Sequence, residues 1–340
     1  MGGKLTIKQI ADMAGVSVAA VSYTLNGKKG VGEATRKRIL DTIENTNYTP
    51  NVNSRRLILQ KSFNILLVID ADNSPLDNLF YMEIMSSIVD NGAKYGYNVV
   101  LVKLTETFEE SCLKNTLLQH NADGIIFLCD ISPDFQKSIN KIGTPFVVID
   151  SQRANPPYPS IRADYNTASQ RATEYLIENG HTKIAMLGSD NIPEYYMCTF
   201  EGYKNVLEEY GINVKSEWIQ SNANNDVAIK NCVQKLLDDD DVPTAIFCSS
   251  DFIAVNAMSY LQTLGYVLPD DFSVCSIDDI TLSRYHFPSL TTVRIDKEAM
   301  GKLAVDMLNE LINGEDTKIN VTVPSCELVI RNSVKKIANI

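Results

Sequence analysis

The sequence lacks any long apolar run, and this limits where the protein can reside. No uninterrupted apolar stretch approaches the roughly 20 residues that a helix needs to cross a bilayer, although apolar residues make up 44% of the chain. The N-terminus is polar and has no apolar core of the kind that secretory signals carry. These absences predict a cytoplasmic protein with no membrane partner. A chain of 340 residues is long enough for two or three domains.

Histidines and paired cysteines are also scarce, which argues against an enzyme. The three histidines, His120, His181 and His286, are isolated, and no H-E-x-x-H, P-loop or G-x-G-x-x-G sequence occurs. The seven cysteines are scattered without a C-x-x-C pair, which predicts reduced thiols rather than disulfides or a metal site. We therefore expect no catalytic residue, no cofactor and no metal.

Positive charge is scarce overall but is concentrated at one end of the chain. The formal net charge is −11, which by itself disfavours DNA binding. Residues 1–62, however, hold ten Lys and Arg against four Asp and Glu, a balance of +6, so the remaining residues carry −17. A small basic head on a large acidic body is expected when only the head contacts phosphates.

The basic head opens with a pattern for two short helices joined by a tight turn. Thr6 and Gln9 have the spacing of a capping box at the start of the first helix. Gly15 supplies the positive φ that ends a helix sharply. The apolar residues between them recur at helical spacing and predict one buried stripe: Ile7, Ile10, Ala11 and Ala14.

The second helix follows directly, with Ser17 as its cap. Val21 and Leu25 are expected to be buried, whereas Ala19 and Tyr23 lie on nearly the opposite side and are expected to be exposed. Two helices around a glycine-containing turn are typical of the helix-turn-helix, whose second helix enters the DNA major groove. On this pattern alone, an ordinary small helical hairpin is the alternative.

The same positions resemble the signature of a known family. The residues that carry the resemblance are Thr6-Ile7, Ile10-Ala11, Ala14-Gly15-Val16-Ser17, Val21-Ser22 and Leu25-Asn26. They are similar to the opening motif of the LacI/GalR (lactose-repressor/galactose-repressor) family of bacterial transcriptional regulators. Gly180-His181, Asp278-Asp279 and Leu328–Ser333 fit the family's order as well, so the resemblance covers essentially the whole chain. It implies a regulator, and more specifically a repressor, that binds operator DNA.

The resemblance also implies which residues contact DNA. Residues 33–46 read as a third helix, with Ile39, Leu40 and Ile43 buried. In relatives, the segment that matches 51–62 forms a hinge helix on DNA, and Leu57 matches a leucine that wedges between base pairs in the minor groove. The alternative is a linker with an incidental leucine. The implied DNA-binding residues are Thr6, Ser17, Val18, Ala19, Ser22, Tyr23, Asn26, Arg36, Tyr48, Asn51, Ser54, Arg55 and Leu57.

Two departures from the family affect which operator is read. Relatives commonly have threonine and arginine where this chain has Ala20 and Tyr23. Arginine binds guanine through two hydrogen bonds, whereas tyrosine offers one hydroxyl and an apolar ring, and the methyl group of Ala19 suits thymine. We therefore expect a palindromic operator whose half-site differs from the family's common one.

After residue 62, short apolar strands alternate with amphipathic helices. Ile65–Ile69, Gly124–Cys129 and Pro145–Asp150 read as strands, and their pattern predicts a parallel sheet covered on both faces. The pattern recurs from Asp164 and predicts a second, similar lobe. Beyond it, Thr292–Ile312 reads as one more strand and helix, and Val321–Arg331 as a final strand.

The expected fold class is therefore α/β, with an N-terminal all-α helix-turn-helix domain before a two-lobed core. The resemblance implies a periplasmic-binding-protein-like core with two parallel sheets flanked by helices. The expected domains are 1–50 for DNA binding, 51–62 for the hinge and 63–340 for the core, whose lobes are 63–162 plus 293–320, and 163–292 plus 321–334. We expect a homodimer, because two hinge helices and two half-sites are read together.

Open parallel-sheet lobes bind ligands at the carboxyl ends of their strands, in the cleft between the lobes. This rule selects Asp72, Asp150, Ser249–Asp251 and Asp278. The carboxylates among them can accept paired hydrogen bonds from sugar hydroxyls or base N–H groups. The alternative is that these aspartates cap the helices that follow. Among them, Asp278 matches a ligand-contacting aspartate of characterised relatives.

The resemblance adds aromatic residues to the expected effector site. Phe80 and Tyr81 match a pair at the cleft rim, and Phe247 matches a position at which some relatives stack a purine base. Aromatic faces pack against sugar CH groups or purine rings. The alternative for each of these rings is a place in the core.

One expected effector position departs from the family. Many relatives clamp the effector with an arginine three residues before a Gly-aromatic pair, and Thr199 takes that position here. Threonine lacks the arginine fork of donors, so Tyr195 or Tyr196 is expected to contribute instead, and an anionic effector is disfavoured. The expected effector is a sugar or related metabolite. Control by a phosphorylated co-repressor protein stays open, as does, more remotely, a solute-binding protein without a DNA role.

Overall fold

The computed structural model describes residues 5–25, 29–46, 48, 61–70, 78–104, 115–117, 122–128, 130–153, 155–324 and 326–337. The chain forms two compact units, Met1–Phe63 and Asn64–Ile340. Residues 51–60 of the predicted hinge lie outside the described residues. None of the described helices combines the length and the apolarity that a membrane crossing requires.

The first unit contains three helices: α1 (Ile7–Ala14), α2 (Val18–Leu25) and α3 (Glu33–Thr46). The predicted capping box of α1 is confirmed. The backbone N–H of Gln9 donates to Thr6 Oγ1 over 3.3 Å, and the backbone N–H of Thr6 donates to Gln9 Oε1 over 2.8 Å. Gly15 ends α1 in the left-handed region with a φ of 62°, so the turn forms where the glycine permits it.

The three helices share one small apolar core. Its buried members are Ile10, Ala11, Ala14, Val21, Ile39 and Tyr48. Leu25 and Ile43 are only partly buried against this core. The prediction that Leu40 is buried was wrong, because its side chain is 49% exposed. Leu40 directly follows Ile39 and so lies about 100° further around the helix, on its outer face.

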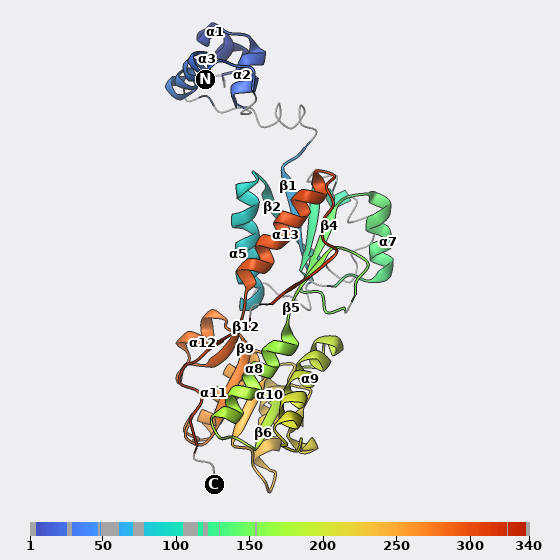
Figure 1. Ribbon diagram of the computed structural model, residues 1–340, viewed down its shortest axis with the longest axis vertical. Coiled ribbons are helices and arrows are strands. Elements are labelled where there is room, and N and C mark those ends of the chain that lie inside the picture. The colour runs from blue at the N-terminus through green and yellow to red at the C-terminus, as the bar shows by residue number, and fades with distance from the viewer. Residues whose placement is uncertain are drawn as a thin grey trace. The chain divides into compact units, whose positions relative to one another are not determined.

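The second unit is built from two six-stranded sheets (Figure 1). In spatial order, the first contains β11 (Asn320–Val323), β5 (Ser160–Ala163), β4 (Phe146–Ile149), β3 (Gly124–Leu128), β1 (Asn64–Asp70) and β2 (Asn98–Leu104). The second contains β12 (Cys326–Val329), β10 (Thr291–Ile295), β9 (Ser273–Asp278), β8 (Ala245–Cys248), β6 (Ile184–Leu187) and β7 (Ile219–Gln220). All pairs are parallel except β10 with β12. The two sheets therefore repeat one topology.

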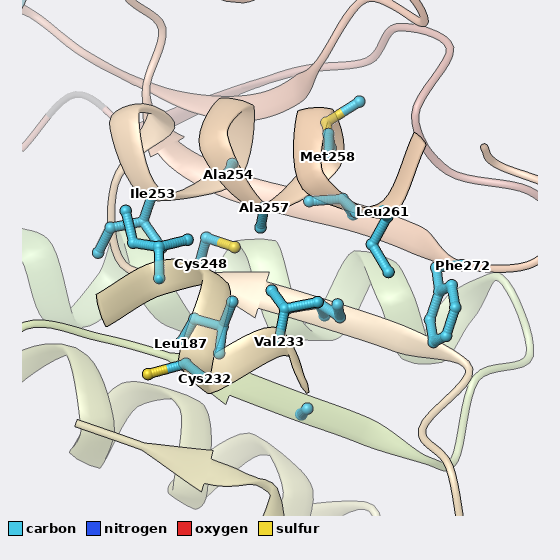
Figure 2. Close-up of a cluster of buried hydrophobic side chains, with 14 of the residues drawn as sticks. Leu187, Cys232, Val233, Cys248, Ile253, Ala254, Ala257, Met258, Leu261 and Phe272 are labelled. Carbon is cyan, nitrogen blue, oxygen red and sulfur yellow. The ribbon is translucent and has the colours of Figure 1, made fainter. Parts of the chain in front are cut away.

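Helices connect the strands within each lobe. The first lobe carries α5 (Leu79–Lys94), α7 (Pro133–Ile142) and α13 (Lys297–Ile312). The second carries α8 (Tyr165–Glu178), α9 (Pro193–Glu209), α10 (Asp226–Leu237), α11 (Asp251–Thr263) and the short α12 (Thr281–Tyr285). In the second lobe, the labelled side chains of β6 and β8 face those of α10 and α11, with Leu187, Val233 and Met258 among them (Figure 2).

The end of the chain crosses between the lobes at other residues than the sequence predicted. The strand β10 pairs with β9 in the second sheet, although residues 293–295 were assigned to the first lobe. The predicted final strand 321–331 is two strands, of which β11 joins the first sheet and β12 the second. Apolar alternation marks a strand but does not say which sheet receives it. The chain therefore passes from lobe to lobe after β5, after β10 and after β11.

A buried ion cluster connects the end of β9 with β10 and with the segment that follows β12. Asp279 accepts from Arg294 Nε over 2.8 Å and pairs with Arg331, and its side chain is only 5% exposed. Burial alone would raise the pKa of this carboxyl. The hydrogen bonds and charges of Arg331 and Arg294 outweigh burial and lower the pKa below its usual range. The cluster thereby holds the backbone directly after Asp278.

We predict that Asp279→Asn lowers the free energy of unfolding by about 3 kcal/mol at pH 7, because it leaves buried guanidinium charge uncompensated. A lowered folded-state pKa stabilises the fold above the unfolded-state pKa, and this contribution is lost as the pH falls through the folded-state value. The difference in melting temperature between wild type and variant should thus be constant down to about pH 5 and narrow below about pH 4.

The control for this prediction is Asp270→Asn, since Asp270 pairs with Lys335 on the surface, where both side chains are about half exposed. Asp270→Asn should lower the free energy of unfolding by less than about 1 kcal/mol. Equal costs for the two variants would contradict the assignment of Asp279 as a buried anchor.

Candidate functional site

The start of α2 presents the outer surface of the head. Ser17, Val18 and Ala19 are exposed, Tyr23 is 43% exposed, and Ser22 is half-buried. These are the residues that sequence analysis assigned to the major groove. Thr6 is exposed as well, while its hydroxyl caps α1. The opposite side of α2 packs into the head core through Val21, so the face left outside is the predicted DNA face.

The two neighbouring helices carry exposed positive charge. Lys8 on α1 and Lys37 and Arg38 on α3 are exposed. Arg36 is half-buried, and its Nη1 donates to the carbonyl oxygen of Thr24 over 3.4 Å. Arg36 therefore ties α3 to the end of α2, in addition to the predicted phosphate contact.

Tyr48 requires a correction. It was predicted to contact DNA, but its side chain is 8% exposed and lies in the head core beside Ile39. The ring supplies apolar area to a very small core, which explains its position. The other predicted DNA contacts at Asn26, Asn51, Ser54, Arg55 and Leu57 lie outside the described residues, as does the predicted effector residue Asp72.

In the core, Asp150 lies at the carboxyl end of β4. Its carboxylate accepts hydrogen bonds from the hydroxyls of Tyr81, over 2.8 Å, and Tyr165, over 2.7 Å. Gln152 Nε2 adds a third over 3.0 Å. Burial raises the pKa of Asp150, and the three hydrogen bonds oppose that rise. Because Tyr81 belongs to α5 and Tyr165 to α8, Asp150 links elements of both lobes.

Sequence reasoning missed Asp130 and Tyr165. Asp130 follows β3 and accepts from Ser151 Oγ over 2.5 Å and from the backbone N–H of Gln152 over 2.8 Å. It shapes the loop that carries Asp150. A signal existed for Asp130, which follows a buried strand as the predicted aspartates do. No local pattern pointed to the first residue of α8.

Asp251 is the predicted effector residue that the structure reassigns most clearly. It is fully buried, and its carboxylate accepts from the hydroxyls of Ser276, Ser283 and Thr292 and from the backbone N–H of Ile280. Four donors fill the acceptor capacity of a carboxylate. Asp251 therefore joins β9, β10 and α12, and it has no capacity left for an effector.

Asp278, at the end of β9, is different. It is 7% exposed and has a φ of 124°, which an L-residue rarely adopts. Burial and the charges of Asp251 and Asp150 raise its pKa well above the usual range, and Lys297 opposes them. No side chain among the described residues donates a hydrogen bond to its carboxylate, and the backbone N–H of Asp251 lowers its pKa only in part. Asp278 therefore keeps acceptor capacity for a ligand, and its unusual backbone fits a functional position.

Tyr195 of α9 is the last member of the group of residues around Asp150 and Asp278. Its ring meets that of Tyr165 edge to face at 4.8 Å, and its hydroxyl donates to the carbonyl oxygen of Ser249. The charges of Asp278 and Asp150 both raise the pKa of Tyr195, after burial, so the aspartates of the two lobes act on one place. Ser249 itself is fully buried, and its hydroxyl has no hydrogen-bond partner among the residues that the structure describes.

Two other predicted effector residues belong to the interior of the second lobe. Phe247 is fully buried and stacks on Tyr203 at 6.0 Å with 12° between the ring planes. Thr199 is fully buried, and its hydroxyl hydrogen-bonds the carbonyl oxygens of Tyr195 and Tyr196 within its own helix. Both predictions were wrong, because a strand or helix position matched from sequence does not reveal which face is already covered.

Phe80 and Tyr81, which were predicted at the rim of the cleft, belong to α5, and Tyr81 donates to Asp150. Their rings lie edge to face at 5.3 Å, and each side chain is less than one-tenth exposed. Lys297 Nζ lies 5.7 Å from the centroid of the Phe80 ring. In the part of the chain that the structure describes, no group of three or more His, Cys, Asp or Glu side chains could hold a metal ion.

We predict opposite effects for the neighbouring residues Ser249 and Ser250. Ser249→Ala should leave the melting temperature unchanged or raise the stability by about 1 kcal/mol, because it removes a buried hydroxyl without a partner. Ser250→Ala is the matched control and should cost about 1 kcal/mol, because Ser250 caps α11. Thermal denaturation of the ligand-free protein measures both. Equal losses would show that the Ser249 hydroxyl has a protein partner.

Comparisons with known proteins agree with this arrangement. Residues 6–51 match the bacterial regulatory proteins of the lacI family, and residues 173–334 match the periplasmic binding protein-like domain. Among solved structures, the chain is similar to the transcriptional regulator CelR in complex with cellobiose (TM-score 0.70, 25% identity, 97% of this chain and 99% of that chain). The lac repressor dimer bound to operator and the anti-inducer ONPF shares the fold (TM-score 0.76, 24% identity, 98% of this chain and 100% of that chain).

Two relatives are similar over nearly their whole length. The transcriptional repressor PurR of Mannheimia succiniciproducens is 32% identical, over 98% of this chain and 99% of the relative. Catabolite control protein A of Priestia megaterium is 31% identical, over 97% of this chain and 99% of the relative. These relatives are regulators and not enzymes. With its helix-turn-helix head and its two-lobed core, the chain belongs to the LacI family of bacterial transcriptional regulators.

Proposed function

We propose that this regulator is a repressor that binds a palindromic operator as a homodimer, and that a small molecule bound near Asp278 sets its affinity for DNA. The observation that carries the proposal is the exposed start of α2, from Ser17 to Ala19, on a head whose other exposed side chains include Lys8, Lys37 and Arg38. The hinge residues, with Leu57 as the minor-groove wedge, belong to the same proposal.

The chemistry around Asp278 favours an uncharged effector with several hydroxyl groups. Besides burial, the charges of Asp251 and Asp150 raise the pKa of Asp278, so negative charge is concentrated at this place and disfavours an anionic effector. Asp278 has capacity to accept hydrogen bonds, and Tyr195 contributes an aromatic ring. A sugar or related metabolite supplies donors for the carboxylate and CH groups for the ring. The similar CelR structure contains cellobiose.

A homodimer is supported by large apolar side chains exposed on the second lobe. Tyr285 is 74% exposed and Phe287 is 86% exposed, and Leu282 on α12 and Phe252 on α11 are exposed as well. Exposed apolar groups of this kind mark contact surfaces. A two-fold dimer would bring two heads to the two half-sites of a palindrome.

Coupling between effector and DNA follows from differential affinity. An effector changes operator binding only if it binds two arrangements of the lobes unequally. Asp150 receives Tyr81 from α5 and Tyr165 from α8, so a shift of one lobe against the other changes contacts at the effector site. Such a shift would alter the spacing of the two hinges in the dimer.

Control by a phosphorylated partner on the first lobe is less favoured. The groove between α5 and α13 is lined by Glu83, Asp90 and Glu298, with Lys94 as its one cation. Carboxylates on this surface would repel a phosphate.

We predict strongly salt-dependent binding to an operator selected from random DNA. If the dimer neutralises six or more phosphates, its affinity should fall by about 10³-fold or more between 50 and 200 mM salt. Fluorescence anisotropy with the selected duplex measures this dependence. A shallow salt dependence, or undiminished binding after deletion of residues 1–62, would overturn the proposal.

A separate prediction concerns the dimer. Tyr285→Glu combined with Phe287→Glu should give monomers in sedimentation experiments, because the charged groups cannot be buried against a second copy. Operator affinity should then fall at least tenfold, since one head reads one half-site. Val227→Glu is the control, because Val227 is an apolar residue of a different helix, α10, with a side chain 67% exposed, and the variant should change neither quantity. A stable dimer of the double variant would refute the assigned interface.

A further inference from the structure

A buried lysine lies where the chain crosses from the second lobe to the first. Lys297 is the first residue of α13 and is 3% exposed. Its ammonium group donates to the carbonyl oxygen of Asp278, to that of Asp279 over 3.3 Å and to that of Ile295 over 3.4 Å. The side chain thus satisfies backbone carbonyls at the end of β9, where the effector residue lies.

The same ammonium group also contacts the first lobe. Its Nζ lies 3.4 Å from Glu83 Oε2 and 5.7 Å from the centroid of the Phe80 ring, and both residues belong to α5. Glu83 in turn accepts from the hydroxyl of Thr281, on α12 of the second lobe, over 3.3 Å. Lys297, Glu83 and Thr281 therefore form a chain of polar contacts between the lobes, which we term the interlobe clamp.

We propose that Lys297 is a positioning residue: it holds Asp278 in its ligand-binding conformation and transmits changes there to α5 through Glu83. This inference rests on the proposed effector site at Asp278. It adds a specific route, through Lys297 and Glu83, by which a change at Asp278 affects α5.

The backbone at Asp278 explains why such a residue is needed. Asp278 and Asp279 have φ values of 124° and 53°, so two consecutive non-glycine residues occupy disfavoured conformations. Such conformations persist only where the surroundings fix them. Lys297 fixes the two carbonyl groups, and Arg331 and Arg294 fix the Asp279 side chain. A ligand that moves Asp278 must therefore also move Lys297.

The other end of the clamp is a helix with an exposed apolar face. Leu79, Met82 and Val89 of α5 are each between 39% and 49% exposed and lie on one side of the helix. Glu83 follows Met82 directly. A displacement of Lys297 is thus passed to the helix that carries a surface suited to a second subunit, and not only to the lobe interior.

Hydrogen–deuterium exchange on the full-length, ligand-free protein tests the clamp. Lys297→Met should increase exchange at least tenfold in two segments that belong to different lobes, the first turns of α5 and residues 278–285, because both lose their shared partner. Exchange in β3 and β8 should stay at wild-type rates. Lys302→Met is the matched control, since Lys302 lies on the same helix with a side chain 60% exposed, and it should change neither segment.

A second variant separates the two ends. Glu83→Gln removes the ion pair but keeps the bonds from Lys297 to the carbonyls, so exchange should increase in α5 and α12 but not at Asp278. Lys297→Arg keeps a cation and several donors and should restore much of the protection. If the exchange rate of Lys297→Met increased evenly over the second unit, or only in residues 296–300, the proposal would be overturned in favour of a purely structural role for Lys297. If Lys297→Met does not fold, the pattern for Glu83→Gln decides.

Operator binding supplies the readout that a purely structural role would not move. Provided that its melting temperature equals that of the wild type, Glu83→Gln should change the dissociation constant for the selected operator at least fivefold. Lys302→Met should change this constant less than twofold. An unchanged constant in a variant with altered exchange would refute transmission to α5. If the wild-type protein binds no operator, the proposed function fails, whereas the exchange experiment still decides whether Lys297 joins the two lobes.

Discussion

A carboxylate removed from water must find hydrogen-bond donors, and this constraint organises the core of the molecule. Asp150 obtains its donors from Tyr81, Tyr165 and Gln152, and Asp251 obtains four from β9, β10 and α12. Among the described residues, no side chain donates to the carboxylate of Asp278, and the backbone of Asp251 only lowers its pKa. The same residue type at three strand ends thus has two functions. Two aspartates hold elements together, and the third keeps capacity for a ligand.

Much of the fold could be predicted because each local signal has one dominant cause. Thr6, Gln9 and Gly15 define α1 by capping, and the continuous apolar run 65–69 marks a strand buried on both faces. The short elements β5, β7 and α12 were missed, since between two and five residues give no usable period. The last two strands, β11 and β12, were predicted as one, because sheet membership depends on contacts between segments far apart in the sequence.

The site could be predicted only as far as topology determines it. Parallel strands place their carboxyl ends together, which was enough to select Asp150 and Asp278. Burial overturned Phe247 and Thr199, because the packing of α9 against the second sheet covers them. Lys297 could not be identified from sequence, since a lysine at the start of a helix ordinarily extends into solvent. Its partners, Glu83 and the Asp278 carbonyl, are about 210 and 20 residues away in the chain.

Charge in the core connects these observations. Among the described residues, Lys297 is the one lysine or arginine in the buried class, and it lies beside a group of buried aspartates. An ammonium group inside a protein is stable only while its partners stay close. The arrangement of the lobes around Lys297 is therefore restricted to positions that keep both Glu83 and the β9 carbonyls within reach. A ligand hydroxyl that binds the Asp278 carboxylate acts on the residue whose backbone carbonyl Lys297 holds. Occupancy of a small site can consequently alter the balance between lobe arrangements without any contact between ligand and α5.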